Sequence, residues 1–293
     1  MKRVSFYDHI SANKRNSVFL IIIVIVIMIL LGSIIGLVFI GSAIAGFFLA
    51  FFIGLILTLI SIFSGDSILL SVSGAKEADK KEHVFLINTV EGLSIAAGIP
   101  MPKVYVINDN TINAFATGRN PKKSSIAVTT GALQKLNRSE LEGVIGHELS
   151  HIKNYDVRFM MIATVLVGIV SLLSNFFLRS FFYSSGDKDN KTPPIFLIIG
   201  IILAILAPIS VTLIKLAISR RREFLADANG ALITRHPTGL ASALKKIKED
   251  TTKPSLTANK ATAHLYISNP FKNSQLFSTH PNIDERIKRL VNM

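Results

Sequence analysis

The hydrophobic residues of this 293-residue chain are gathered into four long, nearly uncharged runs, at residues 18–40, 42–63, 159–183 and 195–218. Each of the first two is long enough to cross a hydrocarbon core of about 30 Å as a helix. They are separated only by a short Gly-Ser turn. A cleaved signal peptide does not fit, because the first run is too long and a second follows at once. We therefore predict a transmembrane hairpin over residues 18–63.

The two later runs carry a single charge each, Arg179 and Lys215, close to their ends. Each fits either a full membrane span or a helix half-buried in the folded protein, and Pro208 should kink the last one. We predict two further apolar helices over residues 159–218 and expect them to be transmembrane.

The polar segments between the runs have patterns of their own. Residues 76–97 favour a helix that ends at Gly98, residues 103–107 alternate as a strand does, and residues 124–130 predict a second strand. Ser139 with Glu142 forms a capping-box pattern at the start of the next helix. These segments predict a small α+β unit beside the apolar helices.

Charge placement predicts the orientation. The formal net charge is +13, but no basic stripe with interleaved aromatic residues is present, so we expect no nucleic-acid partner. Lys and Arg instead flank the apolar runs, before the first and after the second and fourth, as at the cytosolic ends of membrane spans. We expect a multi-pass protein of the cell membrane with both termini cytosolic. The chain has no cysteine, which excludes disulfides and thiolate chemistry.

The string HELSH, from His147 to His151, is the strongest chemical signal. On a helix, positions i and i+4 lie on one face, so both imidazoles can bind one metal ion. Glu148, beside them, can take a proton from a metal-activated water. Two surface histidines on a helix are the competing interpretation. The predicted helix cap and an apolar helix face favour the site.

A catalytic zinc ion usually has three protein ligands, and the third must here be His, Glu or Asp. Our candidate is Glu223 in the segment RRREFLAD, with Asp227 four residues later on the same helix face. Asp227 would accept the second ring N–H of a ligand histidine and fix its orientation. By itself, the segment fits equally well a solvated carboxylate paired with a neighbouring arginine. For Arg222 and Asp156 we expect only salt-bridging or capping roles.

The chain resembles the HtpX-type membrane zinc metalloproteases, which are related to the CAAX prenyl endoproteases. HELSH is followed by EFLAD at Glu223 and by STHP at residues 278–281, with NAFATG at residues 113–118 upstream. The apolar hairpin and the two later runs fit the same family. The resemblance implies His147, His151 and Glu223 as ligands of one zinc ion per subunit.

The resemblance also implies an endopeptidase for damaged or misfolded membrane proteins, with Glu148 as the general base. For the developing oxyanion we predict His280 as the donor, with Asn113 second. The strand before the metal helix would be an edge strand that pairs with an extended substrate. It comprises Ser124, Ser125, Ile126, Ala127, Val128, Thr129 and Thr130.

The predicted fold is therefore a mainly α membrane protein: a transmembrane helical bundle with a small α+β, zincin-like cytosolic catalytic domain. In chain order we expect a cytosolic N-terminus (1–17), the hairpin (18–63), a cytosolic protease segment with the HELSH helix (64–158), the later apolar helices (159–218) and a cytosolic protease segment with the third ligand (219–293). Two alternatives remain, an intramembrane-cleaving zinc protease and a non-enzymatic membrane metal-binding module. Polar residues around HELSH disfavour the first, and the second would not need Glu148.

Overall fold

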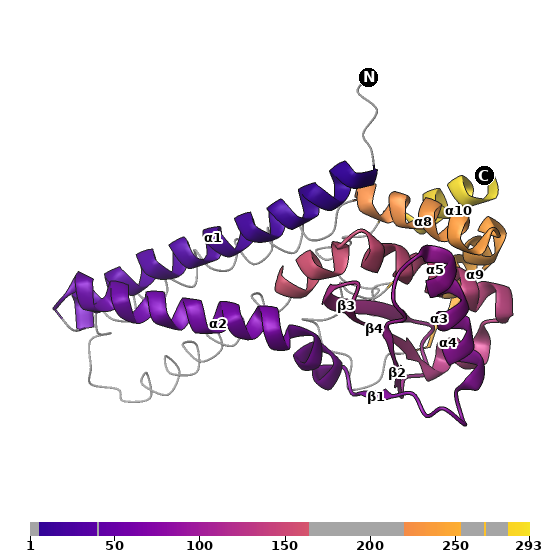
Figure 1. The fold of residues 1–293 in the computed structure, drawn as a ribbon, viewed down its shortest axis with the longest axis horizontal. Coiled ribbons are helices and arrows are strands. Elements are labelled where there is room, and N and C mark those ends of the chain that lie inside the picture. Colours follow the sequence, from indigo (N-terminus) through magenta and orange to yellow (C-terminus); the bar gives the residue numbers. More distant parts are fainter. Residues whose placement is uncertain (1–5, 40, 164–219, 253–266, 268–280) are drawn as a thin grey trace, which may run out of the picture.

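The computed structural model describes residues 6–39, 41–163, 220–252, 267 and 281–293. Of the predicted apolar helices, residues 164–183 of the first and all of the second (195–218) lie outside the described residues, as does His280. The described part is mostly helical with one small sheet (Figure 1).

The first two helices, α1 (Phe6–Phe39) and α2 (Ala43–Val72), form a hairpin that extends away from the rest of the described chain (Figure 1). Gly41 has a φ of 74°, which glycine adopts without a steric cost, and the side chain of Ser42 caps α2 by accepting from the Ala45 N–H. The helices pack backbone to backbone, since a Cβ atom on Gly46 would lie 2.7 Å from the Gly36 Cα. Both helices are long and apolar enough to cross a membrane.

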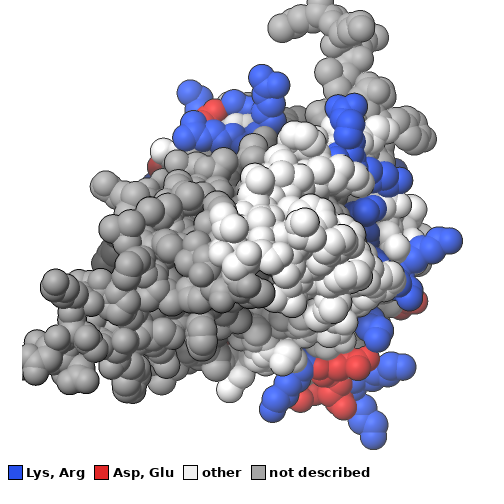
Figure 2. Space-filling model, turned by 90° about the vertical axis from the view of Figure 1, so that its left-hand side faces the viewer, with Lys and Arg blue, Asp and Glu red and all other residues white. Residues whose placement is uncertain are grey.

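The exposed surface of the hairpin is apolar. Figure 2 shows the protein from the side of the hairpin tip. Most of the described surface in this view is uncharged (white), and Lys and Arg side chains (blue) lie along the margin of the uncharged area. Many large hydrophobic residues of α2 are exposed, among them Phe48, Phe52, Ile56 and Phe63. An apolar surface of this size is characteristic of contact with lipid or protein.

The sheet has four strands in the order β1-β2-β4-β3. They are β1 (Ala75–Glu77), β2 (Lys103–Ile107), β3 (Ala114–Asn120) and β4 (Lys123–Thr129). β4 pairs in parallel with β2 and antiparallel with β3. The prediction that residues 124–130 form an edge strand is therefore wrong: β4 is interior, because the tight turn after β3 folds that strand onto its free side. Among the described strands, the two edges of the sheet are β1 and β3.

The described part of the chain also contains the helices α3 (Val84–Ala97), α4 (Thr130–Lys135), α5 (Arg138–Lys153), α8 (Arg220–Thr234), α9 (Pro237–Glu249) and α10 (Ile283–Val291). Residues 156–163 are also helical. The predicted helix over 76–97 is wrong in its first third. There the chain forms β1, which pairs with β2, and then a turn in which the Asp79 carboxylate accepts the Lys81 and Glu82 N–H groups.

Helix α5 begins at a capping box, but the box is made by Asn137 and Glu140 rather than by Ser139 and Glu142. Asn137 Oδ1 accepts from the Glu140 N–H at 3.0 Å, and Glu140 Oε2 accepts from the Asn137 N–H at 2.8 Å. Glu142 forms an ion pair with Arg138 at 2.8 Å instead. The cap of the helix therefore lies two residues earlier than predicted. The apolar side of α5, with Ile145, Leu149 and Ile152, is fully buried.

Candidate metal centre and its supporting residues

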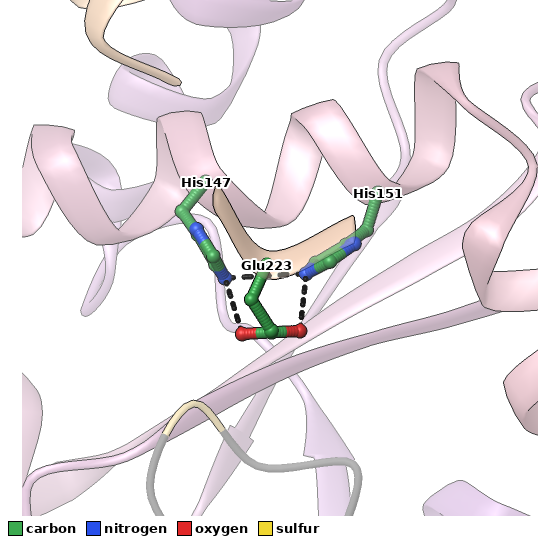
Figure 3. A group of neighbouring side chains, drawn as sticks. All are labelled: His147, His151 and Glu223. Atoms are coloured by element: carbon green, nitrogen blue, oxygen red, sulfur yellow. Dashed lines mark hydrogen bonds and ion pairs between the residues drawn. The ribbon is translucent and has the colours of Figure 1, made fainter. Parts of the chain in front are cut away.

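His147 and His151 lie one turn apart on α5, with side chains directed to the same point (Figure 3). Their Nε2 atoms are 3.2 Å apart, and both residues are buried. The spacing of four residues in the sequence produces this proximity, because the helix advances 3.6 residues per turn. The helix itself is fixed in place by its buried apolar side.

Glu223, near the start of α8, closes the group from the opposite side (Figure 3). Its Oε2 lies 3.7 Å from the His147 Nε2, and its Oε1 lies 3.5 Å from the His151 Nε2. Ligand atoms about 2.0–2.1 Å from a tetrahedral zinc ion would be about 3.3 Å from one another. The distances of 3.2, 3.5 and 3.7 Å fit that arrangement, so these three residues can hold a zinc-sized ion.

Each histidine has a carboxylate at its other ring nitrogen. Asp227 Oδ1 lies 2.9 Å from the His147 Nδ1, and Asp156 Oδ2 lies 3.0 Å from the His151 Nδ1. A carboxylate at Nδ1 holds the proton there and leaves the Nε2 lone pair directed to the metal position. Asp227 thus lies where its predicted role requires it. For Asp156 the sequence indicated a salt-bridging or capping role, but it did not indicate that the partner is the metal-binding histidine His151.

Arg286 on α10 joins the two carboxylates of α8, and no sequence pattern pointed to it. Its Nε and Nη2 lie 2.9 and 2.7 Å from the two oxygens of Asp227, and its Nη1 lies 3.5 Å from Glu223 Oε2. The side chain is fully buried. Two buried carboxylates require a compensating cation. This requirement was the only indication that a buried arginine or lysine would lie beside Asp227 and Glu223. Nothing in the sequence indicated which of the many arginines would meet it.

The acidic residue between the histidines is also buried. Desolvation raises the pKa of the Glu148 carboxyl, and the Ala116 backbone N–H donates a hydrogen bond to it. A raised pKa is appropriate to a group that must accept a proton and later release it. For His151, burial opposes the charge, but the Asp156 hydrogen bond and nearby carboxylates raise its pKa to about 9. A metal ion that binds at its Nε2 must therefore displace a proton.

Asn113 and residues 124–130 are the other predicted site residues that the structure describes. Asn113 is buried at the start of the edge strand β3, where its backbone pairs with Thr129 and its Oδ1 accepts from the Ala114 N–H at 3.2 Å. Its role with an oxyanion stays a prediction. Of the predicted substrate strand, residues 124–129 lie inside the sheet in β4, and Thr130 begins α4.

The chain is similar to known proteins over most of its length. The family description "Peptidase family M48" matches residues 80–293. The "Protease HtpX homolog" of Dictyoglomus thermophilum is 47% identical and covers 99% of this chain and 95% of its own. That of Streptococcus gordonii is 41% identical, with 98% of this chain and 99% of its own covered.

A solved structure, that of S. mikatae Ste24p, superposes with a TM-score of 0.50 at 20% identity. The match covers 82% of this chain and 57% of that one, so it shows similarity of fold alone. The family match and the identity to the protease relatives, in contrast, extend over the metal cluster itself. The chain therefore belongs to peptidase family M48 and is a metalloprotease of the HtpX type.

Proposed function

We propose that this protein is a zinc-dependent endopeptidase, held in the cell membrane by α1 and α2, that cleaves damaged or misfolded membrane proteins. The observation that carries the proposal is the convergence of His147, His151 and Glu223, whose ligand atoms all lie within 4.8 Å of one another. Imidazole and carboxylate ligands in a tetrahedral arrangement favour zinc among the common metal ions.

Zinc, when bound, would supply Lewis-acid chemistry for the scissile carbonyl and for the attacking water. The protein residues do the rest. Glu148 takes the proton from the water and delivers it to the leaving amine. Its buried position and raised pKa support this role. Asp227 and Asp156 hold the two ligand imidazoles in the required tautomer and orientation.

The oxyanion that develops on the substrate needs hydrogen-bond donors, for which His280 and Asn113 remain our candidates. We assign to β3, an edge strand whose Ala116 N–H bonds to Glu148, the role of aligning the substrate. The Ala114 carbonyl oxygen of β3 already accepts the Ile267 N–H at 3.1 Å, which supports the ability of this edge to form a backbone hydrogen bond with a residue outside the sheet. Backbone pairing of this kind reads little side-chain identity, as a quality-control protease requires.

For the membrane arrangement we retain the domain division and topology inferred from the sequence, with four crossings and the catalytic segments in the cytosol. The apolar surface of α2 and the Lys and Arg residues at its margin support contact with lipid (Figure 2). A hairpin anchor would keep the site near the bilayer, where membrane-protein substrates are concentrated. A reporter fused after Met293 tests the orientation; an extracytoplasmic signal would contradict it.

Metal analysis combined with proteolysis tests the proposal as a whole. The full chain, purified in detergent micelles, is expected to carry one zinc ion and to hydrolyse casein. A chelator should abolish hydrolysis, and zinc added back should restore it. Hydrolysis that continues in a protein stripped of metal would overturn the proposal.

A further inference from the structure

The first apolar helix contributes a side chain to the neighbourhood of the metal cluster. Asn13 on α1 is 6% exposed, although it lies only a few residues before the long apolar run. The match to the peptidase family begins at residue 80, so α1 lies outside it. Figure 1 shows the start of α1 beside the start of α8. The helix that anchors the protein therefore also contacts its catalytic domain.

The Asn13 carboxamide is fully engaged there. Its Nδ2 donates to Asp156 Oδ1 at 2.6 Å and to the Asn154 carbonyl oxygen at 3.0 Å, which uses both of its hydrogens. Its Oδ1 accepts from the Arg222 Nη1 at 3.4 Å. A hydrogen bond of 2.6 Å to a buried carboxylate is of the strong, charge-assisted kind.

Asp156 is the link between Asn13 and the metal cluster. One of its oxygens accepts from Asn13, and the other lies 3.0 Å from the His151 Nδ1. A carboxylate can rotate about its side-chain bonds unless both oxygens are fixed. Asn13 fixes the oxygen that His151 does not use, so the direction of the second oxygen, and with it the imidazole plane, is determined.

The turn that carries Asp156 is held by α1 as well. Tyr155 has a φ of 61°, which is unfavourable for a residue with a large side chain. The Lys14 ammonium lies over its ring, 4.4 Å from the centroid. Neighbouring residues of α1 thus contact the carbonyl of Asn154, the ring of Tyr155 and the carboxylate of Asp156, which follow one another after α5.

We propose that Asn13 is a positioning residue for the metal ligand His151, acting through Asp156, so that the seating of the membrane helix α1 sets the metal affinity of the site. The inference rests on the proposed metal-dependent function. It assigns to the membrane anchor a role in the catalytic architecture, in addition to localisation. Removal of the bonded partner of a ligand histidine typically lowers metal affinity by about 10- to 100-fold.

The test compares variants of the full chain in detergent micelles, all in a Glu148→Gln background that prevents self-cleavage. Zinc dissociation constants are measured by competition with a chromophoric chelator. Asn13→Ala and Asn13→Asp are expected to weaken zinc binding about tenfold or more, with Asp the worse because two carboxylates would face each other. Ser17→Ala is the matched control. Ser17 is fully buried on the same helix, but its hydroxyl donates to the Asn13 carbonyl oxygen of α1 itself.

Cobalt loading gives a second readout that a merely structural role would not move. The visible absorption of bound Co²⁺ depends on ligand geometry, so it should change in Asn13→Ala and stay unchanged in Ser17→Ala. In a double-mutant cycle, the zinc-affinity losses of Asn13→Ala and Asp156→Ala should be strongly non-additive, because they remove the same support.

The outcomes separate cleanly. A parent chain that binds no metal would overturn the proposed function itself. A parent that binds zinc, with Asn13→Ala of equal affinity and equal cobalt spectrum, would overturn this inference alone. Equal losses in Asn13→Ala and Ser17→Ala would also overturn it, since they would show a general loosening of α1.

Discussion

The backbone of Gly230 lies directly against the backbone of His147. A Cβ atom on Gly230 would be 2.9 Å from the His147 nitrogen, a distance that real Cβ atoms essentially never show. The contact joins α8 to α5 at the first metal-binding histidine. Glu223, Asp227 and Gly230 are spaced at i, i+4 and i+7, so they lie on one face of α8. The close approach at Gly230 therefore sets how far Glu223 stands from the two imidazoles.

Gly230→Ala is expected to separate the two helices, because the added methyl group meets backbone that cannot move aside. We expect a loss of about 1–3 kcal/mol in stability and weaker zinc retention. Thermal unfolding and metal content after dialysis measure both. Gly92→Ala is the control, since a Cβ atom there meets nothing within 4 Å. Equal behaviour of the two variants would show that the contact is not close in solution.

Glu148→Gln should retain zinc and lose peptide hydrolysis by at least about 100-fold. The amide keeps the size of the side chain but cannot take a proton from water. Casein hydrolysis and zinc content, measured on the same preparation, check the prediction. Hydrolysis at the parental rate would remove Glu148 from the mechanism.

Glu223→Ala should lose most of its bound zinc, because two imidazoles alone bind the ion poorly. The matched control is Glu142→Ala, which removes a carboxylate of α5 that is paired with Arg138 at the surface. Zinc content after dialysis should fall in the first variant and stay at the parental level in the second. Full retention in Glu223→Ala would place the third ligand elsewhere.

Arg286→Met leaves the buried carboxylates of Asp227 and Glu223 without their cation. We expect a destabilisation of about 3–5 kcal/mol, as is typical when one partner of a buried ion pair is removed. Arg286→Lys should restore little, because one ammonium group cannot make the two parallel bonds to Asp227. Lys288→Met, an exposed change on the same helix, should unfold at the parental temperature. A parental unfolding temperature for Arg286→Met would contradict the assignment.

Asp250 predicts an acid-dependent contribution to the stability. Partial burial opposes its charge, but hydrogen bonds from Thr252, the Ile112 N–H and Lys135 lower its pKa from 3.8 to about 2. A folded-state pKa below the unfolded value means that the stabilisation is complete above about pH 4. It is lost as the pH falls from about 4 to 2.

The unfolding temperatures of the parent and of Asp250→Asn should therefore differ at about pH 7 and converge as the pH falls below about 4. A difference that stays constant between about pH 6 and pH 3 would show that the carboxylate charge is not the cause. The measurement uses detergent-solubilised full chain at matched ionic strength.

Local patterns in the sequence determined several elements of this protein. The apolar runs at residues 18–40 and 42–63 predicted the existence and order of α1 and α2, because about 20 apolar residues are enough for a membrane-spanning helix. They did not predict the lengths, since α1 already begins at Phe6 and α2 continues to Val72. The strand at 103–107 followed from its alternation. The spacing of His147 and His151 placed both on one helix face, since a helix repeats every 3.6 residues. These features depend only on neighbouring residues, and a single sequence records them directly.

The tertiary structure decided the rest. It put β4 inside the sheet and made β3 an edge, because strand order depends on pairings between distant segments. It brought Arg286 to His147 across 139 positions of the chain, and Asn13 to Asp156 across 143. Burial makes such partners necessary, since buried carboxylates and imidazoles must be paired. No local pattern in the sequence, however, indicates which distant residue will be the partner of a given buried group.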